Sequence, residues 1–178
     1  VIVGGSNVVS EAVVDVFARA LPDGTVFDRL SGADRFATAN ALVSDAFGAQ
    51  VPEVFIATGL NFPDALSAAA AAGGSGLPVL LVNGQANTVD PETMRLLTDT
   101  LRPDRVTIVG SAAAVSGGIR DQLAARFPVD RLAGPDRYQT SVAINSARFT
   151  GAMPRAYLAT GTGFADALSG AVLAAVNH

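Results

Sequence analysis

The sequence predicts a three-layer α/β fold with a parallel sheet, and three observations lead to this fold class. Short apolar runs recur along the 178 residues without clean alternation, which is typical of strands buried on both faces. Segments with apolar residues at helical spacing lie between these runs. The connections are too long for hairpins, so the strands should be parallel and joined by right-handed crossovers.

Five apolar runs are the candidate strands. They are Val1–Val3, Glu53–Ala57, Pro78–Val82, Arg105–Val109 and Arg155–Ala159. The segments with the clearest helical spacing are Asp34–Phe47 and Asp136–Phe149. Ser10 and Ser116 each follow an apolar strand and a turn, where a serine is a good N-cap. A further helix is expected over Asp90–Leu101, because a capping Asp precedes a first-turn Pro and an acid that complements the helix dipole.

Composition narrows the class of function. Hydrophobic residues make up 49% of the chain and charged residues 16%, which indicates a compact globular protein. The formal net charge of −4 argues against nucleic acid as a partner, because nucleic-acid binding relies on a basic surface. All 12 basic residues are Arg, so a basic side chain that contacts an anion must be a guanidinium. The absence of Cys excludes disulfides, Cys-ligated zinc and thiol catalysis.

The sequence contains no obvious membrane span or targeting segment. The small, Gly-flanked tract Ala68–Ala72 is expected to be a packed helix, and no other apolar run suggests a membrane span. The chain begins at Val1 without Met and shows no signal peptide. We therefore expect it to be a piece of a longer protein.

The chain repeats itself. The stretch "RLSGADRFATANALVSDAF" starts at Arg29, and "RLAGPDRYQTSVAINSARF" starts 102 positions later, at Arg131. The match continues without a gap, and 20 of the 48 positions paired at this offset are identical. The stretch "IVGGSNVVS" from Ile2 also matches "IVGSAAAVS" from Ile108. This self-similarity predicts tandem repeats of about 102 residues. The expected units are the C-terminal part of one repeat in 1–26, a complete repeat in 27–128 and the N-terminal part of a following repeat in 129–178.

Three linked blocks of the sequence resemble the cell wall-binding repeat 2 family. They are "RLSGADRFATA", "VFIATGLNFPDALSAA" with "PVLLVN", and "RVTIVGSAAAVS". Together the blocks cover essentially the whole chain. Two departures are Phe36, where the family usually has Tyr, and Ser111, which replaces the second glycine of the pair found at Gly4 and Gly5. Family members are Rossmann-like or toprim-like modules, so the resemblance agrees with the predicted α/β fold.

The resemblance implies a non-catalytic anchor of a secreted bacterial protein. Members of the family occur in tandem copies and hold S-layer proteins, adhesins or hydrolases on the cell wall. We therefore expect a location at the cell wall or cell surface and no cofactor. The expected partners are an anionic cell-wall polysaccharide and neighbouring repeats of the same protein. Two alternatives remain open, namely an architectural repeat that assembles into a homo-oligomer without binding polymer, and a nucleotide-binding α/β enzyme.

A glycine-rich stretch, "YLATGTGFADALSG", combines a predicted strand, a turn and a helix, as a dinucleotide-binding loop does. Its counterpart one repeat earlier, "ATGLNFPDALSA", has Asn61 in place of Gly163. Asp64 and Asp166 stand where the nucleotide fingerprint needs a small residue, and an acid there would repel phosphate. The nucleotide interpretation is therefore disfavoured. These acids either cap or charge-balance their helices, or bind sugar hydroxyls or a cation.

Arg35 and Arg137 each follow an Asp in the repeated Gly-x-Asp-Arg motif. One interpretation is a structural salt bridge with Asp64 or Asp166 of the same unit, or across a module boundary. The other is a guanidinium directed at phosphate or carboxylate groups of the polymer. The same choice applies to Arg29 and Arg131, with the structural interpretation favoured.

The ends of two predicted strands carry a Thr-Gly pair, where ligands collect in open α/β sheets. Amides at the following helix start could hold an anion there, although a tight turn would also require the glycine. The polymer-binding candidates are Arg29, Arg35, Arg131, Arg137, Thr58, Gly59, Thr160 and Gly161. The helix-start acids, structural or hydroxyl-binding, are Asp34, Asp64, Asp136 and Asp166.

No catalytic or metal-binding constellation is found in the sequence. His178 is the only His, and at the end of the chain it is a poor candidate for the oriented base that a catalytic triad needs. There is no His pair for zinc, so neither enzyme activity nor a metal site is predicted.

The last unit lacks counterparts of two elements of the complete repeat, the strand Pro78–Val82 and the helix Asp90–Leu101. One edge of its sheet would be exposed unless other structure covers it. We therefore predict that 1–26, or a second chain, packs against 129–178.

Overall fold

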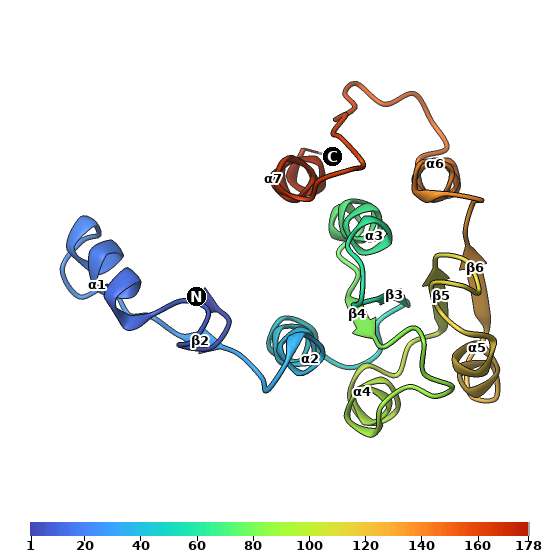
Figure 1. Cartoon of the computed structure of the whole chain (residues 1–178), viewed down its shortest axis with the longest axis horizontal. Helices are drawn as coiled ribbons and strands as arrows, with labels where there is room; N and C mark the ends of the chain where they lie inside the picture. Colours follow the sequence, from blue (N-terminus) through green and yellow to red (C-terminus); the bar gives the residue numbers. More distant parts are fainter. Residues whose placement is uncertain (178) are drawn as a thin grey trace.

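The computed structural model describes residues 1–177 and has the predicted α/β architecture (Figure 1). A four-stranded parallel sheet has the order β4-β3-β5-β6, and β1 and β2 form a separate parallel pair. The strands are β1 (Ile2–Val3), β2 (Arg29–Leu30), β3 (Glu53–Thr58), β4 (Val79–Val82), β5 (Arg105–Val109) and β6 (Val129–Leu132). The helices are α1 (Glu11–Ala20), α2 (Arg35–Ala46), α3 (Pro63–Gly74), α4 (Pro91–Arg95) with its π-helical continuation η1 (Leu96–Leu101), α5 (Gly117–Ala124), α6 (Arg137–Arg148) and α7 (Ala165–Val176). No helix within residues 1–177 combines the length and apolar character needed to cross a membrane.

The helices begin where the sequence supplies caps. The Ser10 hydroxyl accepts from the amide of Val13 at the start of α1, and Ser116 does the same for Ile119 at the start of α5. The Asp90 carboxylate accepts from two amides at the start of α4, ahead of a first-turn proline. These bonds satisfy amides that have no partner within the helix, which explains why the predicted helix starts are correct.

Helices cover both faces of the central sheet, so the three-layer prediction is confirmed. Successive side chains of a strand point to opposite faces, and β3 is buried along its whole length. On one face, Phe55 packs with alanines of α3 and with Ile144 of α6. On the other face, Val54 and Ile56 pack with apolar residues of α2, α4–η1 and α5. Two-sided burial accounts for the unbroken apolar runs seen in the sequence.

The central sheet crosses the repeat boundary expected at residue 128. Strand β6 and helix α6 follow that boundary, yet β6 pairs with β5 from Val106↔Val129 to Val109↔Leu132. The same pairing recurs one repeat earlier, where β1 and β2 pair at Val3↔Leu30. Strands β2 and β6 were not predicted, because each is short and contains charged residues. The limits of the repeats remain a prediction.

The prediction that 1–26 packs against 129–178 within the chain is wrong. Strand β1 forms its ladder with β2, and this holds the N-terminal segment at one end of the molecule, away from α6 and α7 (Figure 1). Helix α1 has no buried residue, and Val16 and Phe17 on it are 63% and 60% exposed. Coverage of 129–178 by a second chain stays a prediction.

The predicted strand Arg155–Ala159 is also wrong, because this segment forms no strand. Its counterpart β3 is hydrogen-bonded on both sides, by β4 and β5. At the repeat offset, the counterparts of those two strands would fall after residue 178, so the segment finds no ladder partner among the described residues. An apolar run becomes a strand only where neighbouring backbone can pair with it. Helix α7, which follows this segment, instead packs against α3, where Gly73 meets Ala175.

A buried ion pair ties α6 to the central sheet. Glu53 at the start of β3 is only 5% exposed, and both of its carboxylate oxygens accept hydrogen bonds from the Arg148 guanidinium of α6. The Thr107 hydroxyl of β5 also donates to Glu53, and the guanidinium lies 4.6 Å from the centre of the Phe55 ring. The pair is particular to this sheet, because Arg155 stands at the repeat position of Glu53.

We predict that Arg148→Met destabilises the fold by about 3 kcal/mol or more, because it leaves the Glu53 carboxylate buried without its partner. Methionine keeps much of the packing volume, so the loss reports mainly on the charge. Urea unfolding followed by circular dichroism measures the change. Arg105→Met is the control. The ion pair between Arg105 and Asp130 has an N–O distance of 3.6 Å, both side chains are exposed, and the pair should contribute less than about 1 kcal/mol to the free energy of unfolding. Equal losses in the two variants would contradict a structural role for the buried pair.

Candidate functional site

The repeated arginines bind backbone carbonyl groups at the ends of strands and turns. Arg35 donates from Nη1 to the carbonyl oxygen of Gly59 at 2.8 Å, and Arg137 makes the same bond to Gly161 at 2.6 Å. The Gly-x-Asp-Arg and Ala-Thr-Gly motifs therefore meet in space in both copies. The Arg–Asp salt bridge considered from the sequence is not among the ion pairs of residues 1–177, although Arg137 does influence Asp64 through its charge.

Arg29 and Arg131 hold the preceding glycine turns in the same manner. Arg29 donates to the carbonyl of Gly4 at 2.7 Å, and Arg131 donates to that of Gly110 at 2.6 Å. A second nitrogen of Arg131 binds the carbonyl of Val115 at 3.0 Å. Burial, together with the charge of a nearby Arg, lowers the pKa of Arg131. These contacts tie both arginines to neighbouring backbone, and polymer binding by this pair stays a prediction.

The glycine that ends each Ala-Thr-Gly motif lies under an aromatic ring. A Cβ atom at Gly59 would lie 2.5 Å from the Phe36 ring, and one at Gly161 would lie 2.6 Å from the Tyr138 ring. The motif therefore needs glycine because the aromatic residue of the Gly-x-Asp-Arg motif packs directly on the backbone. Neither glycine has a positive φ, so a close approach rather than backbone strain excludes larger residues.

The four helix-start acids divide into two pairs. Asp34 and Asp136 are N-caps, since Asp34 accepts from two amides at 2.8 and 2.9 Å and Asp136 accepts from the Gln139 amide at 2.8 Å. Asp64 and Asp166 lie in the first turns of α3 and α7, and neither helix start has a side-chain cap hydrogen bond. Asp64 and Asp166 therefore do not cap their helices, which was one of the interpretations drawn from the sequence.

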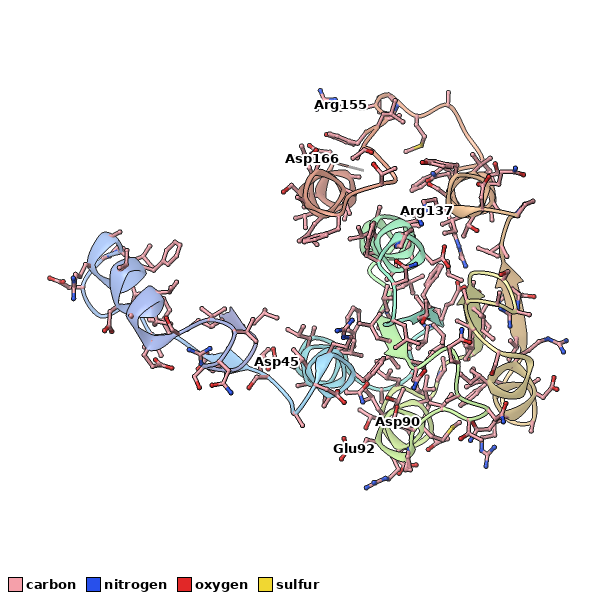
Figure 2. All side chains as sticks on the ribbon, viewed as in Figure 1. Asp45, Asp90, Glu92, Arg137, Arg155 and Asp166 are labelled. Atoms are coloured by element: carbon pink, nitrogen blue, oxygen red, sulfur yellow. The ribbon has the colours of Figure 1, made fainter. Side chains whose placement is uncertain are left out.

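Asp64 faces an unusual glycine at the end of β5. Gly110 has φ +101°, and a Cβ atom there would lie 2.4 Å from Asp64 Oδ2. The Asp64 carboxylate makes no hydrogen bond within residues 1–177, and it is half-buried. Burial raises the pKa of Asp64, and the Arg137 guanidinium opposes the rise only in part. Asp166 occupies the same repeat position but is exposed on α7, on the other side of α3 from Arg137 (Figure 2).

Asp64 and Arg137 line a cavity of about 480 Å³ at the carboxyl ends of β3 and β5, named here the switch-point cavity. The chain leaves β3 toward β4 on one side and returns to β5 on the other, and ligands of open α/β sheets bind at such a reversal. The cavity is lined by Thr58, Leu60, Asn61, Pro63, Asp64, Gln85, Ser111, Ala113, Ala114, Gly134, Pro135, Asp136, Arg137 and Thr140.

The cavity brings together only some of the predicted residues. Four candidates line it: Thr58, Asp64, Asp136 and Arg137. The other eight do not: Arg29, Arg35, Gly59, Arg131, Asp34, Thr160, Gly161 and Asp166. Sequence reasoning missed Gln85, Ser111 and Thr140. The position of Ser111 directly after β5 was a usable signal, because the carboxyl ends of neighbouring parallel strands meet at one edge.

Within residues 1–177, no cluster of three or more acidic, His or Cys side chains could hold a metal ion. His178, the residue considered as a catalytic base, lies outside the described residues.

Comparison with known proteins identifies the family. Residues 29–120 and 131–178 match the Cell wall binding domain 2 (CWB2) family. The chain therefore belongs to this family of cell-wall-binding repeats. It is 32% identical over 152 residues to the amidase enhancer of Bacillus subtilis (strain 168), and 30% identical over 149 residues to N-acetylmuramoyl-L-alanine amidase LytC of the same organism. These matches span 85% and 83% of this chain but only 21% and 29% of the relatives.

Solved structures of related proteins show the same fold. Cwp8 from Clostridium difficile superposes with a TM-score of 0.80 at 29% identity, over 98% of this chain and 29% of Cwp8. Cwp6 from the same organism gives a TM-score of 0.59 at 26% identity, over 71% of this chain and 21% of Cwp6. The chain thus corresponds to a minor part of each of these proteins.

We predict that Asp64→Asn raises the melting temperature at neutral pH. Because the folded-state pKa lies above the ordinary value of 3.8, ionising Asp64 costs the folded state stability above that raised pKa. The advantage of Asn should shrink as the pH falls through the raised pKa toward 3.8, where wild-type Asp64 becomes protonated. Thermal unfolding at several pH values measures both effects.

Asp166→Asn is the control for this prediction, because it changes the same motif at an exposed position. Its melting temperature should stay close to that of the wild type at each pH. A lower melting temperature for Asp64→Asn at neutral pH would contradict a cost from the buried carboxylate.

Proposed function

We propose that this chain is a non-catalytic anchoring module that holds a larger, secreted bacterial protein on the cell wall by binding an anionic wall polymer. The observation that carries the proposal is the family match, which covers both successive copies of the repeat. A location at the cell wall or cell surface follows from the same match. Repeats suit an anchor, because linked weak sites give high avidity without new contacts.

The amidase named among the relatives does not make this chain an enzyme. The chain covers 29% of LytC, which is an amidase, and it matches a segment of similar length in the amidase enhancer, which is named for a different activity. A binding segment shared by proteins of different activity is what an anchor predicts.

Contacts with polymer anions are proposed for Arg35 and Arg137. Each uses one guanidinium nitrogen for a glycine carbonyl, and a guanidinium has five N–H donors in all. The remaining donors can pair with phosphate or carboxylate, and Arg35 is exposed. The carbonyl bond then fixes the orientation of a group that also binds the polymer.

An architectural role is the second candidate, and exposed apolar side chains favour it. Phe17 on α1 and Val172 and Val176 on α7 are 60%, 62% and 75% exposed. Apolar surface of this kind fits packing against neighbouring repeats of the same protein or a homo-oligomer. In this case the chain would self-associate and would not need polymer.

We predict that the chain cosediments with purified Gram-positive cell walls and that binding is lost when the anionic polymer is stripped from them. Arg35→Gln and Arg137→Gln should each weaken binding, and salt should weaken wild-type binding because exposed charges are screened. Arg19→Gln removes the same charge from exposed α1 and serves as the control. Equal binding to stripped and intact walls would contradict the proposal. Concentration-dependent oligomers without wall binding would favour the architectural role.

A further inference from the structure

The switch-point cavity has the chemistry of a site for hydroxyl groups. Its polar lining combines the hydroxyls of Thr58, Ser111 and Thr140 with amide side chains and three charged groups. Two carboxylates, Asp64 and Asp136, and one guanidinium, Arg137, give these charged groups a net charge of −1. A phosphate or carboxylate placed beside Asp64 would be repelled, whereas an uncharged polar ligand would not.

Most of the polar groups in the cavity already have partners. Asp136 caps α6, the Thr140 hydroxyl accepts from the Gly134 amide at 3.0 Å, and Arg137 donates to the Gly161 carbonyl. The Asp64 carboxylate differs, since it has no hydrogen-bond donor within residues 1–177 although it is half-buried. A half-buried carboxylate of this kind is available to accept hydrogen bonds from a ligand that brings its own donors.

The cavity is also of suitable size and position. Its volume of about 480 Å³ falls within the range of roughly 300–1,000 Å³ common for small-molecule sites. It opens where the strand order reverses, which is the usual ligand position in a doubly wound sheet. Because residue 110 is glycine, the Asp64 carboxylate can lie against its backbone. A Cβ atom at residue 110 would displace the carboxylate.

We propose that the switch-point cavity binds one uncharged sugar residue of the wall polymer, with neighbouring sugar hydroxyls donating to the Asp64 carboxylate. This inference rests on the proposed anchoring function. It adds a contact with sugar hydroxyls to the contacts between arginines and polymer anions. The negative groups of the polymer stay away from Asp64 and pair with the arginines proposed above, Arg35 on the exposed surface and Arg137 at the edge of the cavity. The charged and uncharged parts of one repeating unit of the polymer are thus bound at different places on the protein.

The cavity is assembled from two successive repeats. Thr58, Asp64 and Ser111 precede residue 128, whereas Asp136 and Arg137 follow it. A sugar bound here contacts both repeats and so depends on their being joined. Asp166 carries the same motif but is exposed and does not line the cavity, so this chain contains its own matched control.

The test is an NMR titration of the full chain labelled with ¹⁵N. The probe is the set of uncharged sugar units that hydrofluoric acid releases from purified wall polymer. In wild type and in Asp166→Asn, the backbone amides of Leu60, Gly110 and Gly134 should shift on titration. In Asp64→Asn the affinity should fall about tenfold or more, because hydrogen bonds to a charged acceptor are the stronger ones. Absence of shifts at these amides in the wild type, or equal affinity in Asp64→Asn, would overturn the inference.

Wall cosedimentation of the same proteins separates this inference from the proposed function. If the wild type binds walls but the sugar units shift no cavity amide, the cavity inference fails and the anchoring function stands. The sugar units can also shift the resonances of the cavity amides in an Asp64-dependent manner while the wild type does not bind walls. In that case the anchoring function fails and the cavity remains a sugar site. Loss of wall binding in Asp64→Asn, with Asp166→Asn unchanged, would support both together.

Discussion

The parallel pairing of β5 with β6 is the constraint on which the rest of the structure depends. Because β6 lies where the second stretch that matches the family begins, this ladder carries helix α6 onto the face of the central sheet. The start of α6 then supplies its N-cap Asp136 and first residue Arg137 to the switch-point cavity, and its last turn supplies Arg148 to buried Glu53. The apolar core, the buried ion pair and the candidate site therefore all span the junction between two repeats.

The recurring arginines and aromatic residues make the same structural contacts in both copies. The four recurring arginines satisfy glycine carbonyls, and Phe36 and Tyr138 pack on glycine backbone in both copies. These contacts form even around the segment Arg155–Ala159, which is not a strand. The cavity forms only where two copies meet across a complete sheet, so its carboxylate has a different environment from the same residue in the next copy. Repetition in sequence therefore reports on local architecture more directly than on binding.

The sequence predicted those parts of the fold that local pattern controls. Strands β1, β3, β4 and β5 have apolar runs, and the caps of α1, α4 and α5 have suitable side chains, so both were predicted correctly. Arg155–Ala159 was mistaken for a strand because strand formation depends on partners elsewhere, and β6 was missed because it is short and contains charged residues. At the site, strand-end reasoning found Thr58, and comparison of the two glycine-rich stretches found Asp64. It missed Gln85, whose position depends on the loop after β4.

The central claim is that the sheet spanning two repeats is one cooperative unit, and native-state hydrogen exchange tests it most directly. The amide of Phe55 donates to the carbonyl of Pro78, which links β3 to the chain entering β4. The amide of Gly110 donates to the carbonyl of Leu132, which links the end of β5 to β6. We expect both amides to exchange only through global unfolding, with equal opening free energies, whereas the Gly4 amide in the separate β1–β2 pair opens at lower cost. Exchange of Gly110 through a lower-energy opening than Phe55 would show that β6 belongs to a separate unit, and would contradict this account.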